Sequence, residues 1–350
     1  MKYPELLNFS DVLPQLDTFD CIIDARSESE FALDHLPGAI NCPVLNDAER
    51  IRVGTMYKQD SAFEAKKVGA ALVAKNIARH IETLWLDKPR EWRPLVYCWR
   101  GGNRSGAMAH ILARIGWPVV QLDGGYKTYR ARVSENLLEV PQVEFRVVCG
   151  TTGSGKSRLL QVLDSIGAQV LDLEQLAAHR GSVLGNLPSS PQPSQKMFET
   201  TIWNALRRFD PSRPVFVESE SKKVGQLRVP DAVMDKMRAS PCISLTLSRP
   251  NRVRLLMEDY QHFTASPDTL NTQLDCLVKL HGREKINAWH GLANSGQMPA
   301  LVDQLLVEHY DPAYLRSIDR NFVRFGTAEI VELNDIANDD FLAAARHLHR

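Results

Sequence analysis

The sequence predicts an α/β protein of two domains, each a parallel sheet covered by helices. Short apolar runs of β character alternate with longer amphipathic stretches along the chain, the pattern of parallel sheets with helices on both faces. The 350 residues exceed one typical core, and the apolar 44% of the chain is enough to bury two. Two glycine-containing loops each follow an apolar run and precede an amphipathic stretch, one at residue 98 and one at residue 150.

The elements of the first domain follow from this alternation. Three short apolar runs are expected to be strands, at residues 21–24, 95–98 and 119–122. Two amphipathic stretches are expected to be helices, at residues 61–84 and 105–115. The second of these helices begins directly after the loop at Cys98.

The second domain repeats the alternation with more elements. We expect strands at residues 145–149, 170–173, 215–218 and 243–247, and helices at residues 156–165, 195–209, 251–260 and 341–347. Pro141 interrupts the chain between a helix and the strand at 145–149, so the boundary falls near it. We therefore predict a first domain at 1–139 and a second at 140–350 with a helical C-terminal portion.

Composition narrows the class of protein. Lys plus Arg equals Asp plus Glu at 42 each, so an RNA would have to bind a local basic face. The six cysteines form no C-x-x-C pair, which argues against a disulfide framework and a zinc site. The chain starts without a secretory signal pattern and has no apolar run of eighteen residues. We expect a soluble cytoplasmic monomer that does not bind a membrane.

Cys98 is the first candidate catalytic residue. It ends an expected strand just before a helix, so backbone N–H groups surround its sulfur, lower the pKa of a thiol and hold an anion bound to it. Arg100 and Arg104 add cationic groups that can pair with an anion through two hydrogen bonds. We expect this thiol to be ionised and exposed.

The second loop has the full pattern G-x-x-x-x-G-K-[ST] between a strand and a helix, the context in which it binds phosphates. Its backbone N–H groups would cradle a diphosphate or triphosphate, Lys156 would supply a point charge, and Ser157 could contact Mg²⁺ if the ligand is a metal-bound nucleotide. The predicted phosphate-binding residues are Gly150, Thr151, Thr152, Gly153, Ser154, Gly155, Lys156 and Ser157.

Four charged residues elsewhere are candidates for the same site. Asp172 and Glu218 end expected strands and could face the phosphates or a metal ion, or could be ordinary strand ends. Arg249 and Arg252 open a helix after a strand, where P-loop kinases place a cationic lid, although a solvated basic face explains them equally. No strand ends in a clear catalytic Asp, which suggests a diphosphate that is bound without ATP being split. We assign no metal ligand.

Several segments resemble known families. Residues 24–27, 35–41 and 122–126 resemble the signatures of rhodanese domains, whose cysteine carries a persulfide. Five residues separate Cys98 from Arg104, one more than in the common sulfurtransferase loop, and this spacing also resembles cysteine phosphatases. The loop Cys-Trp-Arg-Gly-Gly-Asn-Arg-Ser, with segments 54–59, 125–130 and 217–221, resembles bacterial tRNA 2-selenouridine synthases over essentially the whole chain.

That resemblance implies an RNA-modifying transferase that replaces the sulfur of wobble 2-thiouridine with selenium. It implies geranyl diphosphate and selenophosphate as co-substrates, an S-geranylated intermediate, selenium carried on Cys98, and no redox cofactor. It also implies as partners the anticodon arm of Lys, Glu and Gln tRNAs and the enzyme that makes selenophosphate. Basic and aromatic residues could hold that arm, or could lie on a solvated amphipathic helix: Tyr126, Lys127, Tyr129, Arg130 and Arg132.

Two other interpretations remain open from the residues. The chain could be a rhodanese-type sulfurtransferase or cysteine phosphatase fused to a small-molecule kinase, which the loop spacing and Asp172 favour. It could also be a nucleotide-gated RNA-binding module in which both loops only hold ligands.

Overall fold

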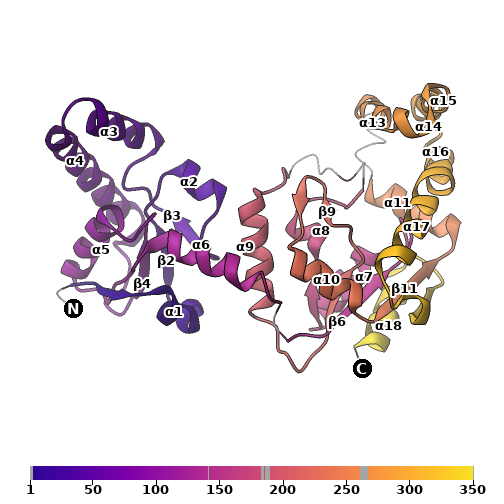
Figure 1. Cartoon of the computed structure of the whole chain (residues 1–350), viewed down its shortest axis with the longest axis horizontal. Helices are drawn as coiled ribbons and strands as arrows, with labels where there is room; N and C mark the ends of the chain where they lie inside the picture. Colours follow the sequence, from indigo (N-terminus) through magenta and orange to yellow (C-terminus); the bar gives the residue numbers. More distant parts are fainter. Residues whose placement is uncertain (1–2, 141, 183–184, 186–189, 261–266, 350) are drawn as a thin grey trace. The chain divides into compact units, whose positions relative to one another are not determined.

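The computed structural model describes all residues except 1–2, 141, 183–184, 186–189, 261–266 and 350. The chain divides into two compact units, Met1–Asn136 with Glu199–Thr201, and Leu137–Phe198 with Ile202–Arg350. Each unit contains a five-stranded parallel sheet (Figure 1). The predicted fold class is therefore confirmed. Pro141, which we placed at the domain boundary, lies outside the described residues.

The sheet of the first unit has the order β1-β5-β4-β2-β3, with every pair parallel. Asp24 at the end of β2 pairs with Tyr97 on β4 and with Asn41 on β3, so the segments after these strands meet at one edge. Cys98 follows the central strand at that edge. The strands are β1 (Glu5–Leu7), β2 (Cys21–Asp24), β3 (Ala39–Asn41), β4 (Pro94–Tyr97) and β5 (Val120–Leu122).

Helices complete the first unit. Ser27 and Asn46 cap α2 and α3 with capping boxes, which satisfy N–H groups that a helix start leaves free. Trp85, Trp92 and Trp117 pack together in the core, with Trp92 edge-on to Trp117. The helices are α1 (Phe9–Val12), α2 (Glu28–Leu33), α3 (Asp47–Gln59), α4 (Ala62–His80), α5 (Asn103–Ile115) and α6 (Gly125–Asn136), and a π-helical turn, Ile81–Trp85, extends α4.

The sheet of the second unit has the order β12-β11-β6-β8-β7, again all parallel. Val148 on β6 pairs with Glu218 on β8, and Leu171 on β7 pairs with Val217, so three strands end close together. A ligand site at that edge is the rule for open parallel sheets. The strands are β6 (Phe145–Cys149), β7 (Gln169–Leu171), β8 (Val215–Glu218), β11 (Cys242–Leu247) and β12 (Glu329–Leu333), and β9 (Lys223–Val224) with β10 (Leu227–Arg228) forms a separate hairpin.

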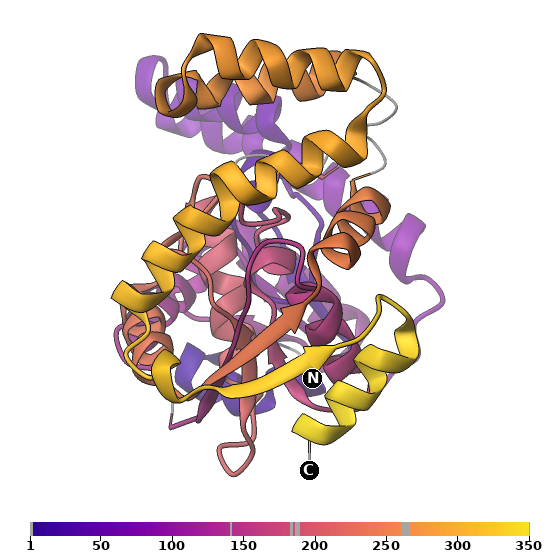
Figure 2. The ribbon, with the colours of Figure 1, turned by 90° about the vertical axis from the view of Figure 1, so that its right-hand side faces the viewer.

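The helices of the second unit form two sets. Those associated with the sheet are α7 (Lys156–Ser165), α8 (Leu173–Leu176), α9 (Gln195–Leu206), α10 (Asp231–Ala239), α11 (Arg249–Asp259) and α18 (Asn338–Leu348). The others are α13 (Pro267–Leu274), α14 (Val278–His281), α15 (Arg283–Asn294), α16 (Met298–Leu305) and α17 (Asp311–Asn321). A π-helical turn, Leu306–Tyr310, joins α16 to α17, and the two run as one long rod in Figure 2.

Two apolar clusters hold the second unit together. Leu160 of α7, Phe216 of β8 and Phe341 of α18 pack in the cluster beside the sheet. A separate cluster around Trp289 joins α13, α15 and α16, and it contains Leu301 and Leu305. The second cluster gives the C-terminal helices a core of their own.

The predicted elements agree well with the structure where the chain is strongly patterned. The strands at 21–24, 145–149 and 215–218 and the helix at 156–165 have the predicted bounds. The prediction missed β1 and β12, which are exposed along much of their length, and the half-buried β3. It also missed the β9–β10 hairpin and the helices α1 to α3, α8, α10 and α13 to α17. Short edge strands lack the continuous apolar run on which the prediction depended.

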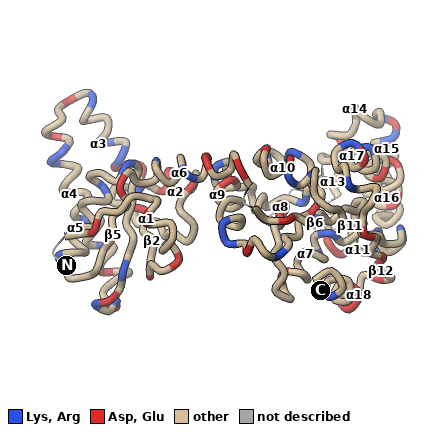
Figure 3. The backbone as a smooth tube through the Cα atoms, turned by 60° about the horizontal axis from the view of Figure 1, so that its bottom comes forward, with Lys and Arg blue, Asp and Glu red and all other residues tan. Residues whose placement is uncertain are grey.

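Charge and membrane propensity complete the description. Basic and acidic positions are interspersed along both units (Figure 3), in keeping with a formal net charge of zero. No helix in the described part of the chain is long and apolar enough to span a bilayer.

Candidate active sites: a cysteine loop and a phosphate loop

Cys98 lies between buried strand β4 and the N-terminus of α5, as predicted, but it is not exposed. The residue is 3% exposed and packs in a cluster with Val96, Met108 and Ala109. Ser105 Oγ donates a hydrogen bond of 3.2 Å to its sulfur, which is the polar contact of the thiol. The expected exposure of the thiol is therefore wrong, because the strand before it is buried and the sulfur belongs to the same core cluster as the buried residues of α5.

The turn at residues 122–126 fixes the backbone of the cysteine loop. The N–H of Tyr126 donates to the carbonyl of Cys98 at 2.8 Å, and the N–H of Lys127 donates to the carbonyl of Trp99 at 3.0 Å. Gly125 has a φ of +56°, and a Cβ there would lie 2.2 Å from the carbonyl oxygen of Cys98. Only glycine fits this contact between two backbone segments.

The two arginines of the cysteine loop differ in their surroundings. Arg104 donates two hydrogen bonds to the carboxylate of Glu30, at 2.6 Å and 3.2 Å. Arg100 is exposed, and no ion pair of its side chain occurs among the described residues. An anion at this loop could therefore pair with Arg100 without displacing another group, whereas Arg104 would have to weaken or break its hydrogen bonds to Glu30.

A buried polar network supports the same loop. Arg26 pairs with Asp24 at 2.6 Å, with both side chains almost fully buried, and its guanidinium lies 4.0 Å from the ring centroid of Tyr126. The hydroxyl of Tyr126 donates to Asp34 at 2.8 Å. Burial raises the pKa of Asp34 and that of Tyr126. Sequence reasoning singled out the segment around Arg26 but not Asp34.

Burial also corrects the expected role of two aromatic residues. Tyr126 is 3% exposed and Tyr129 is fully buried, so neither ring is available to stack on the bases of an RNA. Lys127 remains an exposed candidate for a phosphate contact.

The phosphate loop has the geometry that its motif predicts. It connects β6 to the N-terminus of α7, and Gly153 and Gly155 adopt φ values of +78° and +89°. Lys156 Nζ donates to the carbonyl of Gly150 at 2.8 Å. The N–H of Gly150 donates to the hydroxyl of Tyr314 at 2.6 Å, a partner from α17 that sequence reasoning missed.

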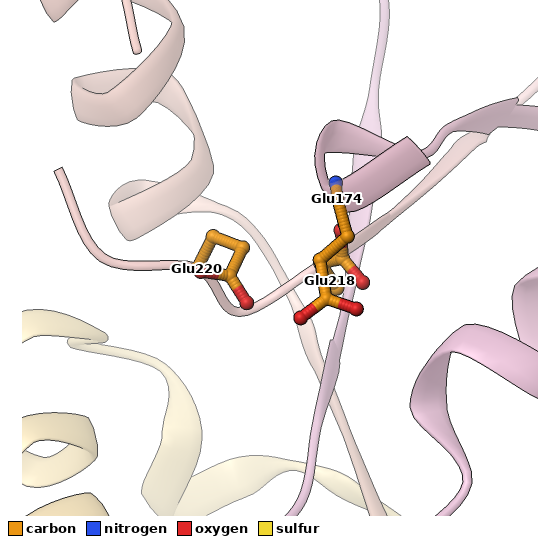
Figure 4. A group of neighbouring side chains, drawn as sticks. All are labelled: Glu174, Glu218 and Glu220. Carbon is orange, nitrogen blue, oxygen red and sulfur yellow. The ribbon is translucent and has the colours of Figure 1, made fainter. Parts of the chain in front are cut away.

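Three carboxylates gather beside this loop (Figure 4). One oxygen each of Glu174, Glu218 and Glu220 lies within 4.8 Å of the other two, and the side chains come from α8 and from the end of β8. Ser157 Oγ donates to Glu174 at 2.8 Å, and the N–H of Glu174 donates to Glu218 Oε1 at 2.8 Å. Glu218 was predicted here, whereas Glu174 and Glu220 were missed because β7 and β8 bring them together from distant parts of the chain.

The carboxylates titrate abnormally because they are buried together. Burial, followed by the charge of Glu174, raises the pKa of Glu218 well above its usual range and raises that of Glu220 to about 8. Burial also raises the pKa of Glu174. Glu218 Oε2 is buried and has no hydrogen-bond partner among the described residues. Such a cluster is costly without a proton or a cation to neutralise it.

The other predicted phosphate ligands have structural partners. Asp172 caps α8 by accepting from the N–H of Gln175 at 2.8 Å. Arg249 pairs with Asp303 on the surface. Arg252 is buried, pairs with Asp311 through two hydrogen bonds of 2.6 Å and 3.0 Å, and donates to the carbonyl of Thr152 at 2.9 Å. The contact of these three residues with a phosphate therefore stays a prediction, and their present contacts favour structural roles.

The fold and the two loops define a class of protein: an enzyme in which an α/β unit with a cysteine loop is joined to an α/β unit with a P-loop. Residues 8–132 match the rhodanese-like domain family, and residues 143–275 match the tRNA 2-selenouridine synthase AAA domain. The chain belongs to the tRNA 2-selenouridine synthase family. The resemblance predicted from the loop motifs is confirmed.

Relatives described as tRNA 2-selenouridine synthase support this placement. The protein of Nitrosomonas europaea is 37% identical over 244 residues, which cover 68% of this chain and 63% of that protein. The protein of Hydrogenovibrio crunogenus is 35% identical, over 71% of this chain and 72% of that protein. The protein of Marinobacter nauticus is 33% identical over 323 residues, which cover 84% and 87%. The aligned region thus spans less than two thirds of the first relative and most of the third.

Proposed function

We propose that this chain replaces the sulfur of wobble 2-thiouridine in tRNA with selenium, in two steps that use different loops. The P-loop unit would alkylate the sulfur with geranyl diphosphate, and the cysteine-loop unit would then deliver selenium from selenophosphate. The observation that carries the proposal is the presence of both loops, folded at helix N-termini, in a chain related to these synthases over most of its length.

The chemistry of the first step suits the P-loop. The uracil sulfur attacks C1 of the geranyl group, the C–S bond forms, the C–O bond breaks, and diphosphate leaves. A leaving diphosphate gains charge, which backbone N–H groups and Lys156 would stabilise. The ammonium of Lys156 already lies at the loop, on the carbonyl of Gly150.

The second step needs a soft nucleophile that carries selenium. Alkylation makes the ring sulfur a better leaving group, so selenium can form a bond to C2 of the base while the C2–S bond breaks and geranylthiol departs. We assign the release of selenium from its donor to Cys98, at the N-terminus of α5 with Ser105 as its hydrogen-bond donor. Its thiolate would attack the phosphorus of selenophosphate, so that an S–P bond forms while the P–Se bond breaks. The selenide set free would attack C2 of the base, and water would then cleave the S–P bond to return the thiol and phosphate. Arg100 and Arg104 would hold the phosphate of the selenium donor.

A magnesium ion fits the residues beside the P-loop. Glu174, Glu218 and Glu220 offer hard oxygen ligands, and Glu218 Oε2 is buried without a partner. These three carboxylates and the Ser157 hydroxyl would hold the ion. When bound, it would neutralise charge on the diphosphate.

We further propose that the anticodon arm of Lys, Glu and Gln tRNAs is the substrate, in the cytoplasm, and that a selenophosphate-producing enzyme supplies the donor. The wobble base belongs to a single-stranded loop, so an enzyme can reach it without opening a duplex.

The decisive experiment separates the two steps. Purified chain is incubated with 2-thiouridine tRNA, geranyl diphosphate, Mg²⁺ and selenophosphate, and the nucleosides are measured by mass spectrometry. We expect Cys98→Ala to form S-geranylated thiouridine but no selenouridine, and Lys156→Ala to form neither. Cys21→Ala, a change at a cysteine outside both loops, serves as the control. Selenouridine formed by Cys98→Ala at the wild-type rate would refute this role of Cys98.

A further inference from the structure

An apolar pocket opens beside the phosphate loop, entirely within the second unit. Its walls come from α11, α13, α16 and the π-helical turn after α16, and the empty space inside it is about 580 Å³ including its open mouth. Leu256, Met257, Leu301 and Leu305 contribute to a lining that is almost entirely hydrocarbon and thioether.

The pocket is continuous with the phosphate loop. Thr152 of that loop is one of the lining residues, and the side chain of Arg252 on α11 donates a hydrogen bond to the carbonyl of Thr152. A Cβ at Gly153 would lie 2.9 Å from Leu256 Cδ1, so the loop and the first side chain of the wall are in contact. A group attached to a phosphate on this loop would therefore have an apolar cavity next to it.

The pocket also lies next to the carboxylates. Ser182 is one of its lining residues, and a Cβ at the preceding Gly181 would lie 2.6 Å from Oε1 of Glu174 and from Oε1 of Glu220. The charged cluster, the phosphate loop and the apolar cavity therefore meet at one place. Charge on one side and hydrocarbon on the other match a ligand with a highly charged head and an apolar tail.

We propose that this pocket binds the hydrocarbon chain of an isoprenyl diphosphate whose diphosphate lies on the phosphate loop. A nucleotide matches the site poorly, because its base would bring hydrogen-bonding groups to a lining that leaves them unpaired. The inference rests on the proposed function in that geranyl diphosphate is its expected ligand. It adds that α11 and α16 form the tail site and set the chain length.

The test is a binding measurement without tRNA or selenium donor. Calorimetric titration of the full chain with Mg²⁺ compares geranyl diphosphate, inorganic diphosphate and ATP. We expect geranyl diphosphate to bind roughly hundredfold more tightly than inorganic diphosphate, because several methylene groups leave water. Equal affinities for the two, or ATP as the tightest ligand, would overturn the proposal.

Two variants locate the tail. Met257→Trp fills the pocket from a partly buried position. It should reduce the preference for geranyl diphosphate over inorganic diphosphate at least about tenfold and leave the affinity for inorganic diphosphate unchanged. Leu301→Ala enlarges the pocket and should shift the preference from geranyl toward farnesyl diphosphate. Leu280→Trp, a change at a residue that is 72% exposed on α14, should alter nothing.

Each outcome decides one point. An unchanged affinity of Met257→Trp for inorganic diphosphate shows that the second unit of this variant is folded. If that affinity is lost, the shift in chain-length preference of Leu301→Ala tests the pocket assignment instead. A retained preference for geranyl diphosphate in Met257→Trp, or an unshifted one in Leu301→Ala, would refute the pocket assignment. Because tRNA is absent, a failure of selenouridine synthesis would leave this result unaffected, and the reverse also holds.

Discussion

Gly125 offers the sharpest test of how the cysteine loop is built. Its φ of +56° and the placement of its missing Cβ, 2.2 Å from the Cys98 carbonyl oxygen and 2.5 Å from the Gly101 nitrogen, set two separate costs for Gly125→Ala. A left-handed backbone costs an alanine about 1–2 kcal/mol. The added Cβ would clash with backbone atoms, so the two backbone segments must move apart. This movement also weakens the hydrogen bond from the N–H of Tyr126 to the carbonyl of Cys98, which is worth about 1 kcal/mol. We expect a loss of about 3 kcal/mol in unfolding free energy of the first unit.

Two glycines separate these costs. Gly38 has a φ of +76° with no atom within 4 Å of a Cβ, so Gly38→Ala should cost only the backbone term of about 1–2 kcal/mol. Gly106 lies in α5, and its Cβ would make ordinary contacts of 3.6 Å with Gln121. Gly106→Ala should therefore stabilise the helix by up to about 1 kcal/mol.

Amide hydrogen exchange by mass spectrometry measures these effects locally, because a chain of two units need not unfold in one transition. Peptides that cover residues 95–130 should lose protection in the order Gly125→Ala, then Gly38→Ala, with gained protection in Gly106→Ala. Diphosphate binding to the second unit should not change. Equal protection in Gly125→Ala and Gly38→Ala would show that the contact with the Cys98 carbonyl does not constrain the loop.

Three further predictions concern the second unit. Burial raises the pKa of Glu220 from an ordinary 4.5 to about 8, so between these pH values the folded chain keeps a proton that the unfolded chain releases. The stability of the folded chain should therefore be full below pH 4.5 and fall as the pH rises toward 8. The loss should amount to a few kcal/mol, at about 1.4 kcal/mol per pKa unit. In thermal melts with EDTA the melting temperature should fall over this pH range, and Glu220→Gln should make that fall smaller. A melting temperature that does not change with pH would contradict the raised pKa of Glu220. Arg252→Ala breaks a buried ion pair and should cost about 3 kcal/mol in urea unfolding, against less than about 1 kcal/mol for Arg254→Ala on the surface; similar losses would argue against a structural role for Arg252. Lys156→Met should weaken diphosphate binding at least about tenfold in calorimetry without changing the melting temperature of the free protein, and unchanged affinity would remove this residue from the site.

The sequence predicted those features that depend on neighbouring residues. The strand, glycine loop and helix around Lys156 are contiguous, and every residue needed to form the helix start is within the motif. The same holds for Cys98, Gly101 and α5. Local patterns therefore placed both loops correctly, each between a strand and a helix.

Features that depend on packing between distant segments were not predictable in this way. Glu174 and Glu220 meet because β7 and β8 are neighbours in the sheet, and Tyr314 reaches Gly150 from 164 residues away. The burial of Cys98 depends on how tightly α5 packs against β4, which no local pattern records. The apolar pocket likewise joins residues from three separate helical segments, α11, α13 and α16 with the turn after it, and each of these would be taken as ordinary core.

Both loops share a property that follows from these distant contacts: several of the side chains proposed to bind an anion already have internal partners. Arg104 is held by Glu30, Lys156 by the carbonyl of Gly150, and Ser157 by Glu174. A ligand must replace these contacts, so a weakly charged anion gains little, whereas a diphosphate with a divalent cation can satisfy Lys156 and neutralise the carboxylates at once. The same exchange makes binding selective, because specificity depends on the difference between ligands rather than on the strength of any one contact. At the P-loop the apolar pocket would add a second requirement for tight binding, an apolar chain. Only a ligand with both a diphosphate and a hydrocarbon chain would then offset the free energy lost when the internal partners are displaced.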